Sequence, residues 1–323
     1  MNRAPITVAI HTLGRDARQE LIDDVRAGLT KFPKALPPRW FYDDAGSELF
    51  EEITRLPEYY QTRTERAILE RYAQDVVART RSASIVELGA GSCTKSRVLI
   101  RAARGMGTLW TFVPFDISEA TIRRAASDLV EEFPDLTIYC VTGEFESHLR
   151  QIPRFGSQLF VFLGSTIGNF DREQTLHFLA EVRGLMQSGD YFLLGVDLVK
   201  DPTELVAAYD DSHGVTARFN LNVLARINRE LHANFDPEGF RHVAVWNPDE
   251  SRVEMHLESR RDQEVSIPDA DMLVVFAERE RMRTEICTKY TKTGVDRLLN
   301  ETGFTVSAWY SDMAERFGLA LAH

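Results

Sequence analysis

Short apolar runs alternate with longer amphipathic segments through the middle of the chain, between residues 84 and 198. The apolar runs are rich in β-branched and aromatic residues, which is typical of buried strands, and the segments between them repeat apolar positions at helical spacing. Strands are expected at 85–88, 109–115, 136–141, 159–164 and 191–198, and helices at 64–80, 119–133 and 173–186. This alternation predicts a parallel, doubly wound α/β sheet.

The alternation stops on both sides of this segment. Residues 16–31 and 203–234 have helical spacing, whereas residues 242–267 alternate apolar and polar positions as antiparallel strands do. The chain ends with a predicted helix at 295–304 and predicted strands at 305–312 and 317–322. We therefore predict one domain formed by residues 64–200 and 290–323, and a second, discontinuous α+β domain formed by residues 1–63 and 201–289.

Composition narrows the classes of partner. The 323 residues carry a formal net charge of -11, and nucleic-acid binding needs clustered Lys and Arg, so a small-molecule substrate is favoured. The three cysteines are sparse, and no His or Cys has metal-ligand spacing, so we expect a reducing cytoplasm and no metal. No run approaches the roughly 18 to 20 apolar residues that cross a bilayer, and the apolar stretch 6–13 lacks a cleavage pattern. We expect a cytoplasmic monomer without a membrane partner.

The segment SIVELGAGSCTKS, at 84–96, leads a strand into a glycine turn and then into a helix. Gly89 and Gly91 permit a tight turn and let a ligand approach the backbone. Thr94 stands at the place of the third glycine of the dinucleotide pattern, which disfavours a pyrophosphate and therefore NAD or FAD. Glu87, just before the turn, suits the amino end of an aminoacyl ligand. A plain strand–helix corner is the alternative explanation of this turn.

Polar residues also follow the next predicted strands. Asp116 ends the second strand, where a carboxylate can accept hydrogen bonds from both ribose hydroxyls; the alternative is a helix N-cap together with Ser118. Glu144 and Phe145 follow the third strand and suit an adenine amino group and ring, or they form an ordinary solvated loop. The fourth strand leads into a polar turn at 164–169. With the C-terminal helix and two strands, this predicts a Rossmann-like class I methyltransferase sheet, parallel with a C-terminal antiparallel hairpin.

Longer motifs lie outside the glycine turn and cover nearly the whole chain. They are PPRWFYDDAGSELFEEITRLPEYYQTRTE, VFLGSTIGNF, LLGVDLVKD, AAYDDSHGVTARFNLNVLARINREL and TEICTKY. With VELGAGSCTKSRVLI, they resemble the histidine Nα-methyltransferases of ergothioneine biosynthesis, which depend on S-adenosylmethionine. The resemblance implies that the substrate is the α-amino group of free L-histidine and that the product is the trimethylated amino acid, hercynine.

The resemblance also implies roles for individual residues in the substrate site. Tyr42 would lie by the cofactor and the substrate amine, and Gly164 would add a backbone contact near that amine. Three residues would anchor the substrate, the last two chiefly by its carboxylate: Tyr59, Asn169 and Tyr209. The imidazole would be bound by Glu285, in a pocket lined by Met255 and Cys287. Taken alone, Met255 is by default a core residue, and Glu285 could equally be a solvated strand residue.

The cofactor residues follow in the same way, so that residues 64–200 and 290–323 would form the S-adenosylmethionine-binding domain and residues 1–63 and 201–289 the substrate-binding domain. Gly89, Lys95, Asp116, Glu144 and Phe145 would bind S-adenosylmethionine, beside Glu87 and Gly91 of the turn. Two positions depart from the family pattern. Glu144 stands where the family carries Asp, which keeps the carboxylate, and Cys287 stands where it carries Ser, which weakens one contact with the imidazole.

The chemistry expected of such a site is an in-line displacement by a neutral amine, with nitrogen, methyl carbon and sulfur nearly collinear. No strong base is assigned, and Tyr42 orients the amine by a hydrogen bond. Tyrosine hydroxyls and the Asn169 amide are expected to hold the carboxylate without a strong cation, because the product carries a permanent positive charge that aromatic faces tolerate. The alternatives are methylation of another free amino acid, tyrosine or tryptophan, and a module that binds S-adenosylmethionine without turnover.

Overall fold

The computed structural model describes residues 7–8 and 17–323, and the contacts of the chain divide it into two compact units. Unit 1 consists of Met1–Leu13, Gln61–Val199 and Tyr290–His323, and unit 2 of Gly14–Tyr60 and Lys200–Lys289. The described strand β1 (Thr7–Val8) pairs with β4 in unit 1, whereas the sequence analysis places residues 1–63 entirely in the second domain. What each domain binds stays a prediction.

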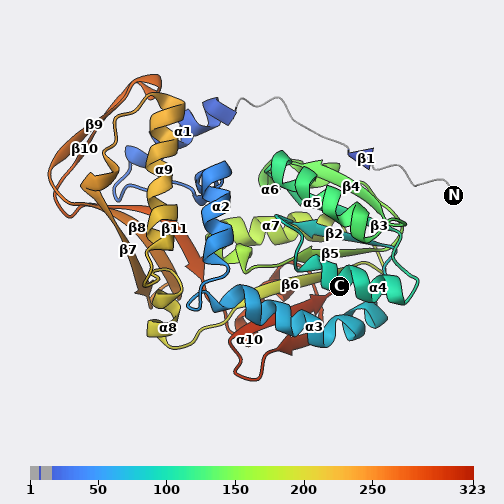
Figure 1. The fold of residues 1–323 in the computed structure, drawn as a ribbon. Helices are drawn as coiled ribbons and strands as arrows, with labels where there is room; N and C mark the ends of the chain where they lie inside the picture. The colour runs from blue at the N-terminus through green and yellow to red at the C-terminus, as the bar shows by residue number, and fades with distance from the viewer. Residues whose placement is uncertain (1–6, 9–16) are drawn as a thin grey trace. The chain divides into compact units, whose positions relative to one another are not determined.

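An eight-stranded sheet forms the centre of unit 1, with strand order β1-β4-β3-β2-β5-β6-β13-β12 (Figure 1). Strands β1 to β6 run parallel, and β13 pairs antiparallel with both β6 and β12. This confirms the predicted parallel sheet with a C-terminal antiparallel hairpin. The strands are β2 (Ser84–Leu88), β3 (Thr111–Asp116), β4 (Thr137–Thr142), β5 (Gln158–Phe162), β6 (Tyr191–Asp197), β12 (Val306–Ser311) and β13 (Phe317–Ala322).

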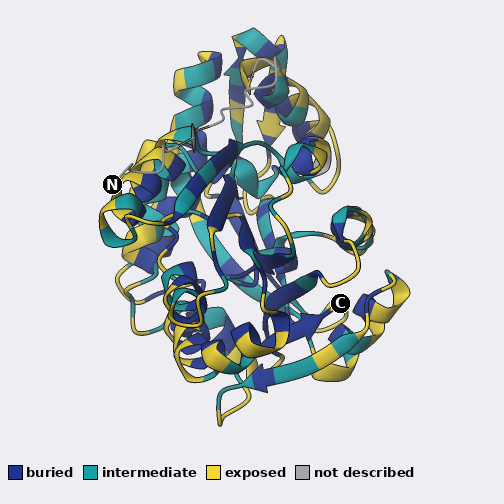
Figure 2. Cartoon of the chain, turned by 90° about the vertical axis from the view of Figure 1, so that its right-hand side faces the viewer, coloured by how far each residue is buried: buried dark blue, intermediate teal, exposed yellow. Residues whose placement is uncertain are grey.

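Helices cover both faces of this sheet because each strand is apolar on both sides. One face packs on α3 (Tyr60–Thr80), α4 (Ser96–Gly105) and α5 (Glu119–Glu132). The other packs on α7 (Arg172–Leu185) and α10 (Lys292–Glu301), with the short α6 (Phe145–His148) beside β4. Figure 2 shows the central strands in the colour of buried residues. Alternate residues of one strand serve the two faces, as Ile85 and Val86 do in β2.

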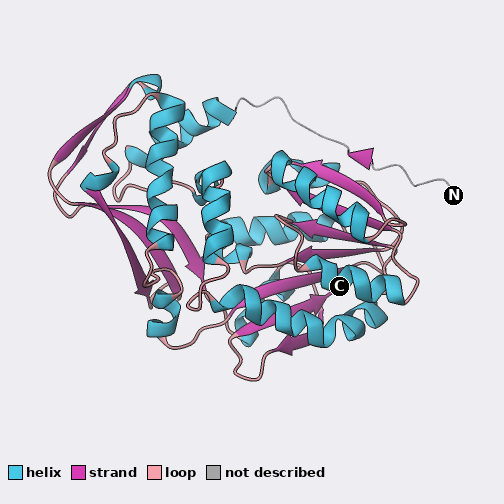
Figure 3. Ribbon diagram, viewed as in Figure 1, coloured by secondary structure: helices cyan, strands magenta, loops and turns pink. Residues whose placement is uncertain are grey.

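Unit 2 has a separate core, built on a three-stranded antiparallel sheet of order β11-β8-β7 and a hairpin of β9 and β10 (Figure 3). These strands are β7 (Phe240–Asn247), β8 (Arg252–Ser259), β9 (Gln263–Ile267), β10 (Met272–Phe276) and β11 (Arg281–Thr288). The helices are α1 (Ala17–Leu29), α2 (Asp44–Ile53), α8 (Pro202–Ala207) and α9 (Val215–Leu231). Helix α9 packs its apolar stripe, which includes Phe219 and Val223, in the same core as Leu257 and Met255 of β8.

The predicted helix at 203–234 is two helices in the structure, with a break before Val215. Asp211 accepts hydrogen bonds from the backbone N–H groups of His213, Val215 and Thr216, which fixes a turn ahead of α9. Gly214 there has a φ of +68°, a left-handed conformation that glycine adopts without strain. The other predicted elements agree with the structure to within a few residues. Among the described residues, no helix is long and apolar enough to cross a membrane.

We predict that Asp190→Ala costs unit 1 about 3 kcal/mol, because a buried charge partner and two backbone acceptor bonds are lost. Asp190 is 1% exposed, pairs with Arg154 through two hydrogen bonds, and accepts from the N–H groups of Gln158 and Gln187. Urea unfolding measures the change. The matched variant Asp135→Ala, at a carboxylate 85% exposed, should cost less than about 0.5 kcal/mol. Equal losses would contradict the argument.

Candidate active site

The glycine turn after β2 is open on the side away from the sheet. Gly89 and Gly91 have φ values of +68° and +50°, and a Cβ placed on Gly91 would meet no atom within 4 Å. The N–H groups of Gly89 and Ala90 donate to the Phe115 carbonyl at the end of β3, which holds the turn against the sheet. The turn can therefore accept a ligand against its backbone. A plain strand–helix corner would not need this open space.

Asp116 braces this turn. Its Oδ2 accepts from the Gly91 N–H at 2.8 Å and its Oδ1 from the Ser118 N–H at 3.0 Å. The N-cap of α5 is Ser118, whose hydroxyl accepts from the Thr121 N–H, so the alternative is confirmed for Ser118, whereas Asp116 itself braces the glycine turn. Burial raises the pKa of Asp116, although hydrogen bonds from Ser118 and Gly91 oppose the rise.

Glu87 is a buried carboxyl without a full set of partners. It is 3% exposed, and its Oε2 has no hydrogen-bond partner among the described residues. Burial raises the pKa of Glu87 to about 8, and the carboxylates of Glu65 and Asp116 add to the rise. A cationic group placed there would find an acceptor already enclosed by protein, which suits the ammonium end of S-adenosylmethionine.

Glu65, on α3, contacts two predicted site residues but was not itself predicted from the sequence. Its buried carboxylate accepts from the Gly164 N–H at 2.9 and 3.0 Å and forms an ion pair with the Lys95 ammonium. Gly195 on β6 leaves room for it, since a Cβ there would lie 2.1 Å from Glu65 Oε1. One carboxylate therefore fixes two predicted ligand-binding positions, Lys95 and Gly164. The only signal in the sequence was its place in the motif YYQTRTE.

The ends of β4 and β5 lie at the same edge of the sheet as the glycine turn, because all these strands are parallel. Phe145 packs on Phe115, with ring centroids 5.8 Å apart, and lies 3.4 Å from the position of a Cβ on Gly89. Glu144 and Phe145 are both half-buried, so they are not a plain solvated loop. Gly164 has a φ of +80° and opens the turn that ends at the half-buried Asn169.

In unit 2, Tyr209, Cys287 and Lys289 form a buried cluster. The Lys289 ammonium donates to the Tyr209 hydroxyl at 2.8 Å and lies 3.0 Å from Cys287 Sγ, and it sits 4.6 Å from the Tyr209 ring centroid. Burial raises the pKa of the Cys287 thiol, while the Lys289 cation opposes the rise. A cation therefore contacts the predicted carboxylate anchor Tyr209. That tyrosine hydroxyls and the Asn169 amide hold the carboxylate stays a prediction.

Glu285 faces the core of unit 2 because of an irregularity in β11. The register shifts by one residue between Arg283 and Glu285, so that Glu285 pairs with Met255 and Cys287 with Val253. Met255 and Cys287 belong to the buried core, 2% and 4% exposed, and Glu285 shares their face. Burial raises the pKa of Glu285 to about 7. The alternative of a solvated strand residue is therefore not supported.

The predicted tyrosines are joined by a chain of aromatic contacts. Tyr42 packs edge-on against Phe50 and Phe219, Phe50 packs against Tyr59, and Tyr59 packs against Tyr209, with centroids 5.6 to 6.4 Å apart. The rings thus present faces and edges along one continuous wall of unit 2, which suits a cation by cation–π attraction.

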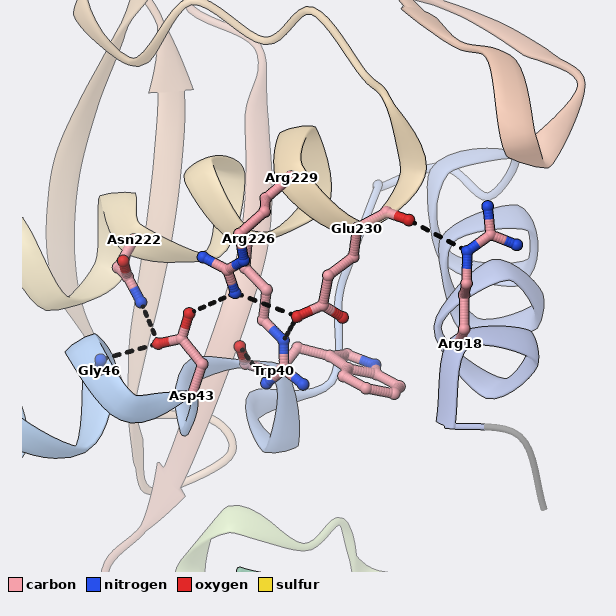
Figure 4. A network of polar contacts seen from close by, with 8 residues as sticks. All are labelled: Arg18, Trp40, Asp43, Gly46, Asn222, Arg226, Arg229 and Glu230. Carbon is pink, nitrogen blue, oxygen red and sulfur yellow. Dashed lines mark hydrogen bonds and ion pairs between the residues drawn. The ribbon is translucent and has the colours of Figure 1, made fainter. Parts of the chain in front are cut away.

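A polar network holds the segment next to Tyr42 (Figure 4). Asp43 caps α2 by accepting from the Gly46 N–H, and it also accepts from Asn222 and Arg229 of α9, at 2.7 to 2.8 Å. Although burial opposes it, these bonds hold the pKa of Asp43 below its usual value. Arg226 donates to the Trp40 carbonyl at 3.1 Å. Tyr42 is therefore tied to α9 on both sides.

The predicted site residues thus fall into two groups. Unit 1 holds the glycine turn and the sheet-edge residues: Glu87, Gly89, Gly91, Lys95, Asp116, Glu144, Phe145, Gly164 and Asn169. Unit 2 holds the aromatic wall and the β8–β11 face: Tyr42, Tyr59, Tyr209, Met255, Glu285 and Cys287. One buried charged residue is added to each group without having been predicted as a site residue: Glu65 in unit 1 and Lys289 in unit 2.

A parallel sheet with a reversed C-terminal hairpin, an open glycine turn and a carboxylate at the tip of β3 define an S-adenosylmethionine-dependent methyltransferase. Residues 21–323 match the model of a family described as histidine-specific methyltransferase, SAM-dependent. The chain belongs to this family, which confirms the resemblance found in the sequence.

Two curated relatives agree with this assignment over nearly their whole length. A histidine N-alpha-methyltransferase of Mycolicibacterium smegmatis is 47% identical over 317 residues, covering 98% of this chain and 99% of that protein. One of Mycobacterium tuberculosis is 48% identical over 318 residues, with the same coverage. Ergothioneine biosynthesis protein 1 of Neurospora crassa is 30% identical over 287 residues, which cover 86% of this chain and 32% of that longer protein.

We predict that Glu65→Ala frees the Gly164 turn, because its backbone N–H loses its acceptor. Hydrogen exchange at Gly164 should accelerate by about tenfold or more. The matched variant is Glu70→Ala on the same helix, where a carboxylate 52% exposed pairs with Arg66. Exchange at Gly164 that responds equally to both variants, or to neither, would contradict the role given to Glu65.

Proposed function

We propose that this protein transfers three methyl groups from S-adenosylmethionine to the α-amino group of L-histidine and so forms hercynine for ergothioneine biosynthesis. The observation that carries the proposal is a full-length match to the histidine-specific family in a chain whose Glu285, Met255 and Cys287 share one face of unit 2. The relatives named above support the pathway. We further propose that the protein acts as a monomer in the cytoplasm, as its three free, buried cysteines suit.

The cofactor is held by unit 1 in this proposal. Glu87 meets its ammonium group, Asp116 its ribose hydroxyls, and Glu144 and Phe145 its adenine. Gly89 and Gly91 let it approach the backbone, and Lys95 meets its negative carboxylate end. When bound, S-adenosylmethionine supplies a methyl group on a sulfonium, and the protein's own residues do the rest.

Glu285 selects the imidazole. A carboxyl with a pKa of about 7 lies close to the pKa of free imidazole, about 6.5, so the two groups can share one proton in a charge-assisted hydrogen bond. Met255 packs against the ring, and the Cys287 thiol takes the place of a stronger donor. An indole or a phenol has no basic ring nitrogen that could share this proton with the carboxylate.

The two polar ends of the amino acid meet different groups. Tyr209 and Asn169 bind the carboxylate. The Lys289 ammonium donates to the Tyr209 hydroxyl, which makes that hydroxyl a stronger donor. Tyr59, Tyr42 and the Gly164 backbone orient the amine, and Tyr42 accepts or relays a hydrogen bond rather than acting as a strong base. The aromatic wall tolerates the permanent charge of the product.

The direct test incubates the purified protein with S-adenosylmethionine and each of the twenty amino acids, and measures the mass gained. Histidine should gain three methyl groups. Methylation of tyrosine or tryptophan instead would assign the protein to another substrate. Binding of S-adenosylhomocysteine without turnover of any amino acid would favour a non-catalytic module.

We predict that Glu285→Ala raises the KM for histidine by about a hundredfold while leaving the Kd for S-adenosylhomocysteine within about twofold, because a charge-assisted bond to the substrate alone is lost. The KM of Glu285→Gln, which keeps one acceptor, should lie between those of wild type and Glu285→Ala. Calorimetry and steady-state kinetics measure both constants. The control is Glu264→Ala on the exposed part of β9. An equal loss of cofactor and histidine affinity would count against the imidazole role.

We predict that binding of S-adenosylhomocysteine at pH 7 releases between about half and one proton, because a ligand ammonium favours the ionised form of Glu87. With a pKa raised from 4.5 to about 8, Glu87 is mostly protonated in the free protein. Its contribution to stability is therefore present below pH 4.5 and is lost as the pH rises through 8.

Calorimetry in buffers of different ionisation enthalpy counts the released protons. Glu87→Gln should abolish the release while binding persists. The same release in both proteins would show that another group titrates.

A further inference from the structure

A hydrogen-bonded network inside unit 2 joins Tyr209 to Glu285, the two ends of the proposed histidine site. His242 Nε2 donates to the Tyr209 carbonyl at 2.7 Å, and Asn220 lies 2.8 Å from the other ring nitrogen of His242. The Thr284 hydroxyl lies 2.7 Å from Asn220 Oδ1, and Thr284 immediately precedes Glu285. These contacts come from three separate elements, α9, β7 and β11.

The donors and acceptors of this network allow one arrangement. A carbonyl only accepts, so His242 carries its proton on Nε2, and neutral Nδ1 must accept from the Asn220 amide. The same amide donates to the His256 carbonyl at 3.1 Å, which leaves Asn220 Oδ1 to accept from Thr284. Burial lowers the pKa of His242, although the Tyr209 carbonyl, Asp210 and Asp211 oppose this, and the neutral ring is the form that the network needs.

The network holds the irregularity of β11 in place. Before the shift, Met282 faces the core and pairs with Leu257; after it, Glu285 and Cys287 do, paired with Met255 and Val253. Thr284 is the extra residue, and its hydroxyl also lies 3.1 Å from the Met255 carbonyl. Asn220 thus binds both strands at the point of the shift. Without the extra residue, Glu285 would point to the opposite face of the sheet.

Burying the Asn220 amide at this position costs folding free energy. It is fully buried on the apolar stripe of α9, next to Phe219 and close to Val223, where a leucine would pack without polar groups to satisfy. Thr284 is 1% exposed, and the His242 side chain is 2% exposed. Three buried polar side chains on three elements satisfy one another, which is a specific arrangement rather than general stabilisation.

We propose that Asn220, His242 and Thr284 are positioning residues that fix the face of β11 on which Glu285 lies and the backbone of Tyr209, and thereby raise the affinity for histidine. The inference rests on the proposed function, because it assigns the imidazole end of the substrate to Glu285 and the carboxylate end to Tyr209. None of the three residues is given a contact with substrate. They act on histidine affinity through the face on which Glu285 lies and through the backbone of Tyr209.

The first test uses two variants of graded severity. Asn220→Leu removes every bond of the amide, and Thr284→Val removes only the hydroxyl at the shift. Each should raise the KM for histidine by about tenfold or more, with kcat at saturating histidine and the Kd for S-adenosylhomocysteine within about twofold of wild type. Thr284→Ser, which keeps the hydroxyl, should restore the wild-type KM.

The matched control lies on the same helix. Asn228 also bonds backbone through both amide atoms, to the carbonyl and the N–H of Phe235, each at 2.8 Å. Asn228→Leu should lower the melting temperature as Asn220→Leu does, yet leave the KM for histidine within about twofold of wild type. A larger KM for Asn228→Leu than for Thr284→Val would reduce the network to a structural role and overturn the inference.

The wild-type protein separates this inference from the function on which it rests. If wild type does not methylate histidine, both fall. If wild type methylates histidine and both Asn220→Leu and Thr284→Val keep its KM, the proposed function stands and the positioning role is wrong.

Discussion

The interaction on which the ligand-binding edge of unit 1 depends is the hold of the Glu65 carboxylate on the Gly164 backbone and the Lys95 ammonium. A charge with no access to water must be matched inside the protein, so its position decides where its partners can lie. Here those partners belong to the end of β5 and to the start of α4. The two segments are far apart in sequence, yet neither can move without exposing Glu65 to an unfavourable environment.

The same constraint recurs in unit 2 with the charge reversed. Lys289 is 2% exposed, it contacts the Tyr209 hydroxyl, the Tyr209 ring and the Cys287 sulfur, and its charge also acts on the Glu285 carboxyl. Each unit therefore carries a buried charge that contacts residues predicted to bind a ligand: Glu65 contacts Lys95 and Gly164, and Lys289 contacts Tyr209 and Cys287.

Sequence reasoning predicted the features that depend on local pattern. The alternation of apolar runs predicts the parallel sheet, and the glycines at 89 and 91 predict an open turn, because both signals lie within a few consecutive residues. It missed Glu65 because an acidic residue in a helix looks like any solvated one until its burial is known. It recognised the alternation of Glu285, Cys287 and Lys289, but a shift of one residue at Thr284 leaves no trace in hydropathy, so the face itself came only from strand register.

The inserted residue in β11 also bears on how such a pocket can change. The extra residue changes which side chains of β11 face the core on its C-terminal side. Those side chains can therefore differ in size and charge while the strand before it keeps its packing. New preferences for the acceptor could then arise by exchanging a few inward-facing groups, with the framework unaltered. Cys287 is one of these inward-facing groups, two residues beyond Glu285 on the same face of the strand.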